Sequence, residues 1–200
     1  MSQSGLLPGD VDMMARCLVL AKDAAAQGEI PFASVICKDG AVVAEGTNRV
    51  VRDRDVTRHA ELQAIAQAQS VLGKRILSGC TLYSIVEPCP MCAFPAREAQ
   101  ISRVVFALRS PLMGGLSKWN ILRDPEISSV MPEAFGVIPE VVVGVLAREA
   151  EAVWKAWNPI AWHVIRRRGC FETTTDNPGL ERLTGERGRR FFRQLLSIHR

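Results

Sequence analysis

The sequence predicts an α/β fold, a sandwich of helices around one mixed sheet of five strands. Three observations support this prediction. Short apolar runs rich in β-branched residues alternate with longer segments whose apolar residues recur at helical spacing. The first two runs are separated only by Lys38-Asp39-Gly40, which predicts an antiparallel hairpin. Helical segments separate the later runs from one another, and such crossover connections produce parallel strands.

The first part of the chain is predicted to hold one helix, a hairpin and a charged loop. Apolar residues recur at helical spacing after Asp10, which is a typical N-cap, and Gly28 marks the end of this helix. The hairpin ends near Asn48, and the segment after it mixes charges without periodicity. The predicted elements are a helix over residues 11–27, strands over 32–37 and 41–44, and a loop over 50–57.

The second part alternates strands with helices and contains one long irregular stretch. An alanine-rich helix ends at Gly73, and a short β-branched run follows it. The stretch after Arg109 holds paired glycines and several prolines, which favour a loop. The predicted elements are helices over 58–72, 91–99 and 147–157, strands over 81–86, 103–108 and 139–145, and a loop over 110–135 with one helical turn near 119–123.

One histidine and two cysteines form the most informative pattern in the chain. His59 precedes Ala60 and Glu61, and Cys89 and Cys92 follow later in a Pro-Cys-Pro-Met-Cys run. Imidazole and thiolate are ligands that zinc prefers, and three protein ligands leave the fourth tetrahedral position open for water. Zinc in such a site lowers the pKa of its bound water to about 7. The pattern predicts a catalytic zinc site, with Glu61 as the group that moves protons.

The spacing of these residues predicts that the site lies where two helices begin. Residues two apart point to nearly opposite faces inside a helix, so His59 and Glu61 share a site only at a first turn. Pro88 and Pro90 favour the same placement for the cysteines, because proline is tolerated in a first turn and not deeper. The partial positive charge of both helix N-termini favours the thiolate form of the two cysteines.

The pair of motifs, His-X-Glu followed by Pro-Cys-X-X-Cys, resembles the signature of the zinc-dependent cytidine deaminase superfamily. From about residue 13 to residue 157, the order of elements is similar to the branch of tRNA adenosine deaminases, guanine deaminases and fungal cytosine deaminases. The resemblance implies a three-layer α/β/α sandwich with a central mixed five-stranded sheet, of the cytidine deaminase-like type. It also implies that His59, Cys89 and Cys92 hold zinc and that Glu61 shuttles protons.

The resemblance also implies contacts to the substrate. Asn48 lies where the family keeps an asparagine that hydrogen-bonds the substrate, and Ala60 is similar to a residue whose main chain contacts the base. The loop over 110–135 follows a strand that leads to substrate-shaping residues in such enzymes. Trp119 is therefore a candidate wall of the pocket, although a role in the core or in an interface suits it equally well.

Two plainer interpretations of the metal motifs stay open. A Cys-X-X-Cys pair alone is also typical of redox and structural sites. A structural zinc site needs a fourth protein ligand, which only the tertiary fold could supply. The remaining candidates for that ligand are Cys17, Cys37, Cys80, Cys170, His163 and His199.

Composition and charge predict a cytoplasmic protein in two parts. The first ten residues have no signal-peptide pattern, and no stretch approaches the roughly 18 apolar residues of a membrane span. Residues 1–165 contain 16 Lys or Arg and 17 Asp or Glu, whereas residues 166–200 contain 9 and 4. We therefore expect a zinc-dependent deaminase domain over 1–165 and a basic C-terminal extension over 166–200. A short helix near 189–198 is expected to dock on the body or on another subunit.

The sequence contains features of more than one substrate class. Pro31-Phe32-Ala33 and a body without net positive charge resemble guanine-type deaminases of free bases, which makes Phe32 a candidate substrate contact. Residues 104–117, with their paired glycines, resemble the tRNA-editing branch instead. Ser110 departs from both groups, because these relatives commonly have an acidic residue there.

From these features we expect a hydrolase that releases ammonia from a free nucleobase or nucleoside, a guanine- or cytosine-type amino-heterocycle. A tRNA adenosine-to-inosine deaminase is the alternative, and a non-catalytic member that binds RNA or a partner is the second alternative. The resemblance further implies a Zn²⁺ cofactor and a homodimer.

Overall fold

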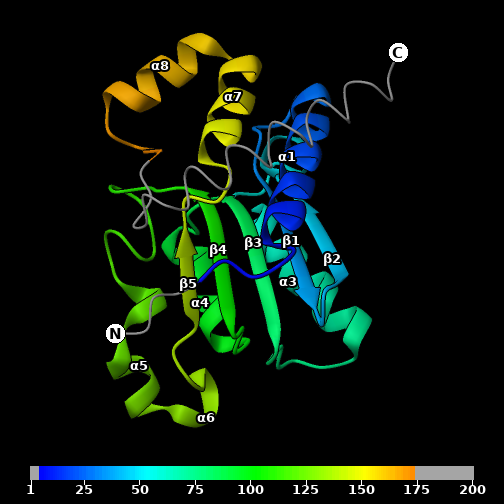
Figure 1. Cartoon of the computed structure of the whole chain (residues 1–200), viewed down its shortest axis with the longest axis vertical. Helices are drawn as coiled ribbons and strands as arrows, with labels where there is room; N and C mark the ends of the chain where they lie inside the picture. Colours follow the sequence, from blue (N-terminus) through cyan, green and yellow to red (C-terminus); the bar gives the residue numbers. More distant parts are fainter. Residues whose placement is uncertain (1–4, 174–200) are drawn as a thin grey trace.

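The computed structural model describes residues 5–173, and it confirms a mixed five-stranded sheet between two layers of helices (Figure 1). The strand order is β2-β1-β3-β4-β5. The strands are β1 (Ala33–Lys38), β2 (Ala41–Thr47), β3 (Cys80–Val86), β4 (Arg103–Leu108) and β5 (Glu140–Val143). The helices are α1 (Asp10–Ala26), α2 (Val50–Asp53), α3 (Ala60–Leu72), α4 (Pro90–Glu98), η1 (Ile121–Arg123), α5 (Pro125–Val130), α6 (Pro132–Phe135), α7 (Ala147–Trp157) and α8 (Pro159–Arg167).

The sheet is antiparallel at one edge and parallel at the other. β1 pairs antiparallel with β2 and β3, whereas β3 with β4 and β4 with β5 are parallel. In the turn of the β1–β2 hairpin, Asp39 and Gly40 have φ values of 50° and 78°, the left-handed conformation that a type I′ turn requires. Because β3 and β4 are parallel, with Val86 opposite Leu108, the residues that follow both strands lie at the same edge of the sheet.

Each face of the sheet has its own hydrophobic core. α1 and α7 cover one face, where Leu18, Val105 and Trp154 are buried. α3 and α4 cover the other face, where Ile36 and Leu82 are buried. Since full burial of such a side chain contributes about 1.5–3 kcal/mol, the second core holds the metal-bearing helices α3 and α4 firmly on the sheet.

A buried ion pair crosses from α1 to the sheet. Asp10, which the sequence suggested as an N-cap, is instead the first residue of α1, and its side chain is fully buried. Its carboxylate accepts hydrogen bonds from Arg103 Nη1 and Nη2 at 2.6 and 2.8 Å and from the Tyr83 hydroxyl at 2.8 Å. Burial, followed by the charge of Asp10, raises the pKa of Tyr83, so this hydroxyl stays protonated and donates.

Four helices depart from the predicted elements. α2 lies inside the expected loop over 50–57, and α5 and α6 lie inside the expected loop over 110–135. α5 and α8 begin at prolines that follow Asp124 and Asn158, and these side chains accept a hydrogen bond from a backbone N–H of the first turn. Both prolines occupy the first helical turn, where proline is tolerated, and the capping side chains stabilise the start of each helix.

The expected turn near 119–123 is confirmed by η1, and the expected boundary between residues 165 and 166 falls inside α8. The helix expected over 189–198 lies outside the described residues. No helix in the described part of the chain combines the length and the apolar character that a membrane span requires.

Candidate active site

The metal motifs meet where α3 and α4 begin, as their spacing predicted. His59 is the N-cap residue of α3 and Cys89 is the N-cap residue of α4, and both have extended backbone conformations. Cys92 lies in the first turn of α4, which starts with Pro90. Ligand atoms of the histidine and both cysteines lie within 4.8 Å of one another. Two helix N-termini therefore converge on one group of zinc-type ligands.

The distances between these ligand atoms fit a zinc ion. His59 Nδ1 lies 3.5 Å from the Sγ atoms of both Cys89 and Cys92, and the two Sγ atoms are 3.7 Å apart. Zn–S bonds of about 2.3 Å and Zn–N bonds of about 2.0 Å at tetrahedral angles require separations of roughly 3.5–3.8 Å. Three edges of a zinc tetrahedron are thus already formed by protein atoms.

The two plainer interpretations fit this geometry less well. The group includes none of the other cysteines or histidines within residues 5–173, so the described residues supply three ligands rather than the four of a structural site. All six cysteines are free, and a separation of 3.7 Å between two Sγ atoms far exceeds a disulfide bond of about 2.05 Å. The geometry is that of an open metal site.

The two thiols of the site differ in acidity. The hydrogen bond between the sulfurs of Cys89 and Cys92, and a further one with His59, lower the pKa of Cys89 to about 4, although burial opposes them. The hydrogen bond with Cys89 and burial raise the pKa of Cys92. The hydrogen bond to Cys89 also raises the pKa of His59. One thiolate is therefore preformed, and zinc binding displaces the second proton, because both ligating sulfurs must be deprotonated.

Chelation of zinc is expected to make Cys89 reactive toward iodoacetamide at about pH 6. Because the pKa of Cys89 is lowered to about 4, its thiolate persists as the pH falls and is lost only as the pH passes through that value. Cys17 is an internal control, since burial raises its pKa and it is fully buried. Peptide mass spectrometry with and without added zinc measures the modification. Equal alkylation of Cys89 in the zinc-loaded and the chelated protein would contradict the assignment.

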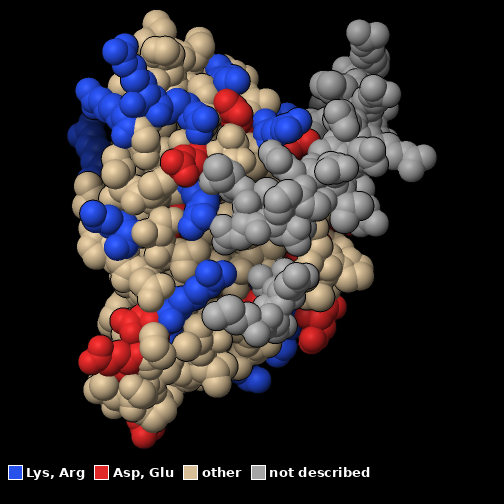
Figure 2. Space-filling view, turned by 60° about the vertical axis from the view of Figure 1, so that its left-hand side comes forward, with Lys and Arg blue, Asp and Glu red and all other residues tan. Residues whose placement is uncertain are grey.

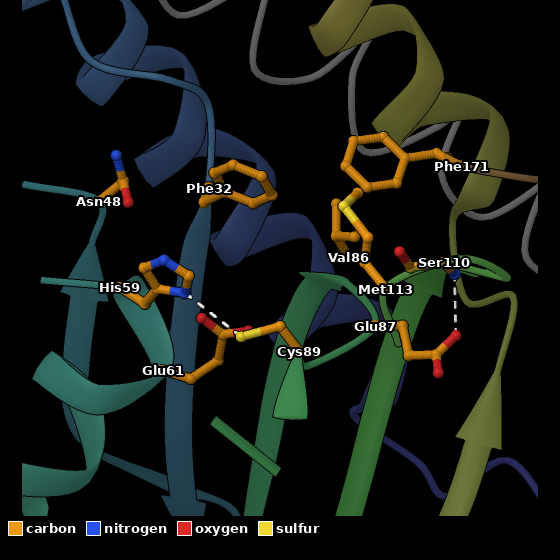
Figure 3. A pocket seen from close by; sticks show the side chains of 10 residues that line it. All are labelled: Phe32, Asn48, His59, Glu61, Val86, Glu87, Cys89, Ser110, Met113 and Phe171. Atoms are coloured by element: carbon orange, nitrogen blue, oxygen red, sulfur yellow. Dashed lines mark hydrogen bonds between the residues drawn. The ribbon is translucent and has the colours of Figure 1, made fainter. Parts of the chain in front are cut away.

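Glu61 lies beside the metal ligands and away from solvent. It occupies the first turn of α3, is 5% exposed, and accepts a long hydrogen bond of 3.5 Å from the Ser84 hydroxyl on β3. Burial raises its pKa, which brings the carboxyl closer to the neutral range in which a group both takes and returns a proton. Figure 3 shows Glu61 next to His59 and Cys89 at one end of a pocket. Its role as the proton shuttle remains a prediction.

The pocket beside these residues has a volume of about 170 Å³. This is below the roughly 300–1,000 Å³ of pockets for drug-sized ligands, so the cavity suits one small heterocycle. Asn48 and Phe32, both predicted to contact substrate, line it on the side of β1 and β2. Ala60 is buried at the start of α3, and its predicted main-chain contact to the base stays a prediction. Trp119 is 51% exposed and is not among the residues that line the pocket, so the structure gives its predicted role no support.

Glu87, a pocket-lining residue that sequence reasoning missed, organises the loop after β4. The Glu87 carboxylate accepts hydrogen bonds from the backbone N–H groups of Ser110, Leu116 and Ser117 at 2.8, 2.9 and 2.6 Å. Gly114 lies so close to this carboxylate that a Cβ there would be 1.9 Å from Glu87 Oε1. Two features of the sequence could have indicated this contact, the Glu-Pro-Cys sequence and the paired glycines. A buried carboxylate needs hydrogen-bond donors, and only glycine lets the backbone of the loop come this close to it.

Phe171 is a further pocket residue that sequence reasoning missed. It follows α8 and is 5% exposed, and Figure 3 shows its ring at the opposite end of the pocket from His59. Glu172 and Arg109 exchange two backbone hydrogen bonds of 2.9 Å, and the Ser110 hydroxyl donates to the Cys170 carbonyl at 3.1 Å. These bonds attach the segment after α8 to the end of β4. No local signal could have placed Phe171, because its position depends on a pairing across more than 60 residues.

Comparisons with known proteins agree with this geometry. The sequence model of the cytidine and deoxycytidylate deaminase zinc-binding region matches residues 9–108. A structure from a study of A-to-I editing by tRNA:A34 deaminases superposes with a TM-score of 0.64 and 31% identity, over 71% of this chain and 98% of its own. A guanine deaminase from Nitrosomonas europaea superposes with a TM-score of 0.59 and 27% identity, over 80% of this chain and 97% of its own.

A longer protein is also similar. A tRNA(Ile)-lysidine synthase of Deinococcus deserti is 37% identical over 141 residues, which are 70% of this chain and 25% of that enzyme. The chain thus spans about a quarter of the length of this relative.

Proposed function

Because this chain belongs to the cytidine and deoxycytidylate deaminase zinc-binding family, we propose that it catalyses the zinc-dependent hydrolytic deamination of a free nucleobase or nucleoside. The substrate is an amino-heterocycle of the guanine or cytosine type, and ammonia is the second product. The observation that supports this function is that three zinc ligands, a buried carboxyl and a small cavity lined by aromatic rings lie together at one site. His59, Cys89 and Cys92 hold the zinc ion, which when bound activates water for attack at neutral pH.

Glu61 moves the protons of this reaction. Its carboxylate takes a proton from the attacking water and gives it to the ring nitrogen next to the attacked carbon. It then transfers the second proton of the water to the amino group, which leaves as ammonia while a carbonyl forms in its place. Burial favours this double use, because it raises the pKa of Glu61 and prevents bulk water from competing for the protons.

The walls of the pocket favour a small substrate. The rings of Phe32 and Phe171 meet edge to face at 6.2 Å, and both contact the buried Trp154 at centroid distances of 5.0 and 5.1 Å. The segment that carries Phe171 is bonded to the end of β4, where it forms one end of the cavity. A planar base can stack against such a ring at the end of the cavity, whereas a nucleotide within an RNA loop also needs an open path for its backbone on both sides.

Replacing Phe171 with alanine is expected to raise KM for the base about 10- to 100-fold and to change kcat little. Stacking of a base on an aromatic ring contributes roughly 1–3 kcal/mol, and the ring does not touch the proton shuttle. Steady-state ammonia release measures both constants. Trp119→Ala is the paired variant, because a larger effect there would make Trp119 the wall of the pocket and contradict the assignment to Phe171.

One observation favours the tRNA alternative. Exposed basic side chains gather at the end of the molecule formed by α7 and α8 (Figure 2). They include Arg148, Lys155, Arg166, Arg167 and Arg168. Such a surface is suited to phosphate contacts, which would make activity fall steeply with added salt.

Ammonia release from guanine, cytosine, adenine, their nucleosides and a tRNA anticodon stem-loop tests the proposed function. The proposal requires turnover of one small molecule that is insensitive to moderate salt and absent in Glu61→Ala. Release from the stem-loop alone would make the chain an RNA-editing enzyme. RNA binding without any release would support the non-catalytic alternative. The expected homodimer is a separate proposal, which a monomer mass in solution would contradict.

A further inference from the structure

We propose that Glu29 is a positioning residue that turns the Asn48 amide oxygen into the pocket, so that the site selects a free base presenting a ring N–H to this oxygen. The inference rests on the proposed function, since it names the substrate class of the same site. Glu29 lies between α1 and β1, and its own side chain does not line the pocket. It acts through Asn48.

Glu29 is a buried carboxylate surrounded by hydrogen-bond donors. It is 5% exposed. Oε1 accepts from the backbone N–H of Arg52 at 2.7 Å, and Oε2 accepts from the backbone N–H of Val51 at 3.4 Å. Oε2 also accepts from Asn48 Nδ2 at 3.1 Å. Because both oxygens already accept from backbone groups, the carboxylate presents an acceptor, and not a donor, to the amide of Asn48.

This arrangement determines which end of the Asn48 amide faces the substrate. An amide turned the other way would place its oxygen against a carboxylate oxygen, with two acceptors facing each other in a site where Asn48 is only 3% exposed. The nitrogen therefore stays on the side of Glu29. Figure 3 shows the amide oxygen of Asn48 directed toward the pocket and the nitrogen directed away from it. The pocket thus presents a hydrogen-bond acceptor at this point.

The same carboxylate is held rigidly because it caps α2. The N-cap residue of α2, Arg49, makes no side-chain capping hydrogen bond to the first turn of the helix. Val51 and Arg52 lie in the first turn, where backbone N–H groups have no partner inside the helix, and Glu29 accepts from both. Rotation of the carboxylate away from Asn48 would break these bonds.

An acceptor at this position distinguishes classes of heterocycle. A free base carries an N–H at the ring nitrogen that bears ribose in a nucleoside, and guanine carries a second one in its lactam ring. Adenosine and cytidine have only acceptor nitrogens in their rings. A site whose buried acceptor is left without a donor rejects the analogue that lacks it, here about 10- to 100-fold.

Matched pairs of bases test the inference on the full zinc-loaded chain. Guanine is compared with 1,9-dimethylguanine and cytosine with 1-methylcytosine, because both methylated bases lack a ring N–H, and kcat/KM gives a ratio for each pair. We expect wild type to prefer the unmethylated base of its substrate pair at least about 10-fold. In Glu29→Gln this ratio should fall toward one, because the new amide can donate to Asn48 and let its oxygen turn away. Glu98→Gln, at an exposed glutamate that pairs with Arg75, should keep the wild-type ratio.

A double-mutant cycle separates positioning from a general structural effect. If Glu29 acts through Asn48, E29Q should change the ratio in the wild-type background and leave it unchanged in N48A. A methyl group that is rejected only by its size would give a ratio that E29Q does not alter. Either that result or an equal effect of E29Q in both backgrounds would overturn the inference.

Binding of the same pairs, measured by calorimetry, distinguishes this inference from the proposed function. Selective binding of the unmethylated base without ammonia release would support the inference and contradict the proposed function. Turnover of adenosine, cytidine or the methylated bases at rates equal to those of the free bases would support the proposed function and contradict the inference. A protein that binds none of the bases would overturn the substrate class that we infer.

Discussion

Glu61→Gln is expected to lower kcat about 10³- to 10⁴-fold while the zinc content stays at its wild-type level. The glutamine keeps the size of the side chain in a position that is 5% exposed, so the pocket retains its shape. It cannot accept and return a proton, and both proton transfers of the reaction depend on this group. The ligands His59, Cys89 and Cys92 are unchanged, so metal binding should persist.

Ammonia release and metal analysis of the same preparation measure these two effects. Glu133→Gln, at an exposed glutamate on α6, is the matched control and should have wild-type activity. Retention of more than about a tenth of the activity by Glu61→Gln would show that another group moves the protons. Loss of zinc together with activity would instead assign Glu61 a role in holding the site.

Arg103→Met is expected to lower the free energy of unfolding by about 3–5 kcal/mol. The substitution leaves the carboxylate of Asp10 without its charged partner in a position that is fully buried. The hydrogen bonds from Tyr83 and from the backbone N–H of Leu7 remain, but neither supplies a compensating charge. Urea denaturation of the zinc-loaded protein measures the change.

The double variant Asp10→Leu/Arg103→Met is the informative control. Removing both charges leaves no buried ion, so the double variant should be more stable than Arg103→Met alone. A cost below about 1 kcal/mol for the single variant would mean that the carboxylate becomes protonated or solvated at little expense. Because this pair lies near the amino ends of α1 and β4, away from the metal ligands, catalytic constants of the folded variants should change little.

The metal chemistry could be predicted from the sequence because its determinants are local. A histidine two residues before a glutamate can share a site with it only at a first helical turn, and prolines next to two cysteines three apart favour the same placement. The structure places His59 and Cys89 at the N-caps of α3 and α4, as that argument required. The hairpin was equally local, since Asp39 and Gly40 adopt the left-handed conformation that their turn demands.

The missed short helices show two different causes. α5 and α8 had local signals in Asp124-Pro125 and Asn158-Pro159, and for α5 the irregular composition of the stretch over 110–135 concealed the signal. α2 had no local cap, because the carboxylate that caps it belongs to Glu29, more than 20 residues earlier. A pattern along the chain contains no information about such a partner.

By itself, the sequence determined the chemistry of this protein, namely which side chains can hold zinc and which carboxyl lies beside them. Only the tertiary structure decided which other side chains line the pocket beside the metal ligands. Phe171 reaches it through the pairing of Glu172 with Arg109, and Asn48 is oriented by a carboxylate that lies before β1. The physical reason is that ligand spacing depends on the geometry of one helical turn, whereas pocket walls depend on contacts between segments that only the sheet brings together.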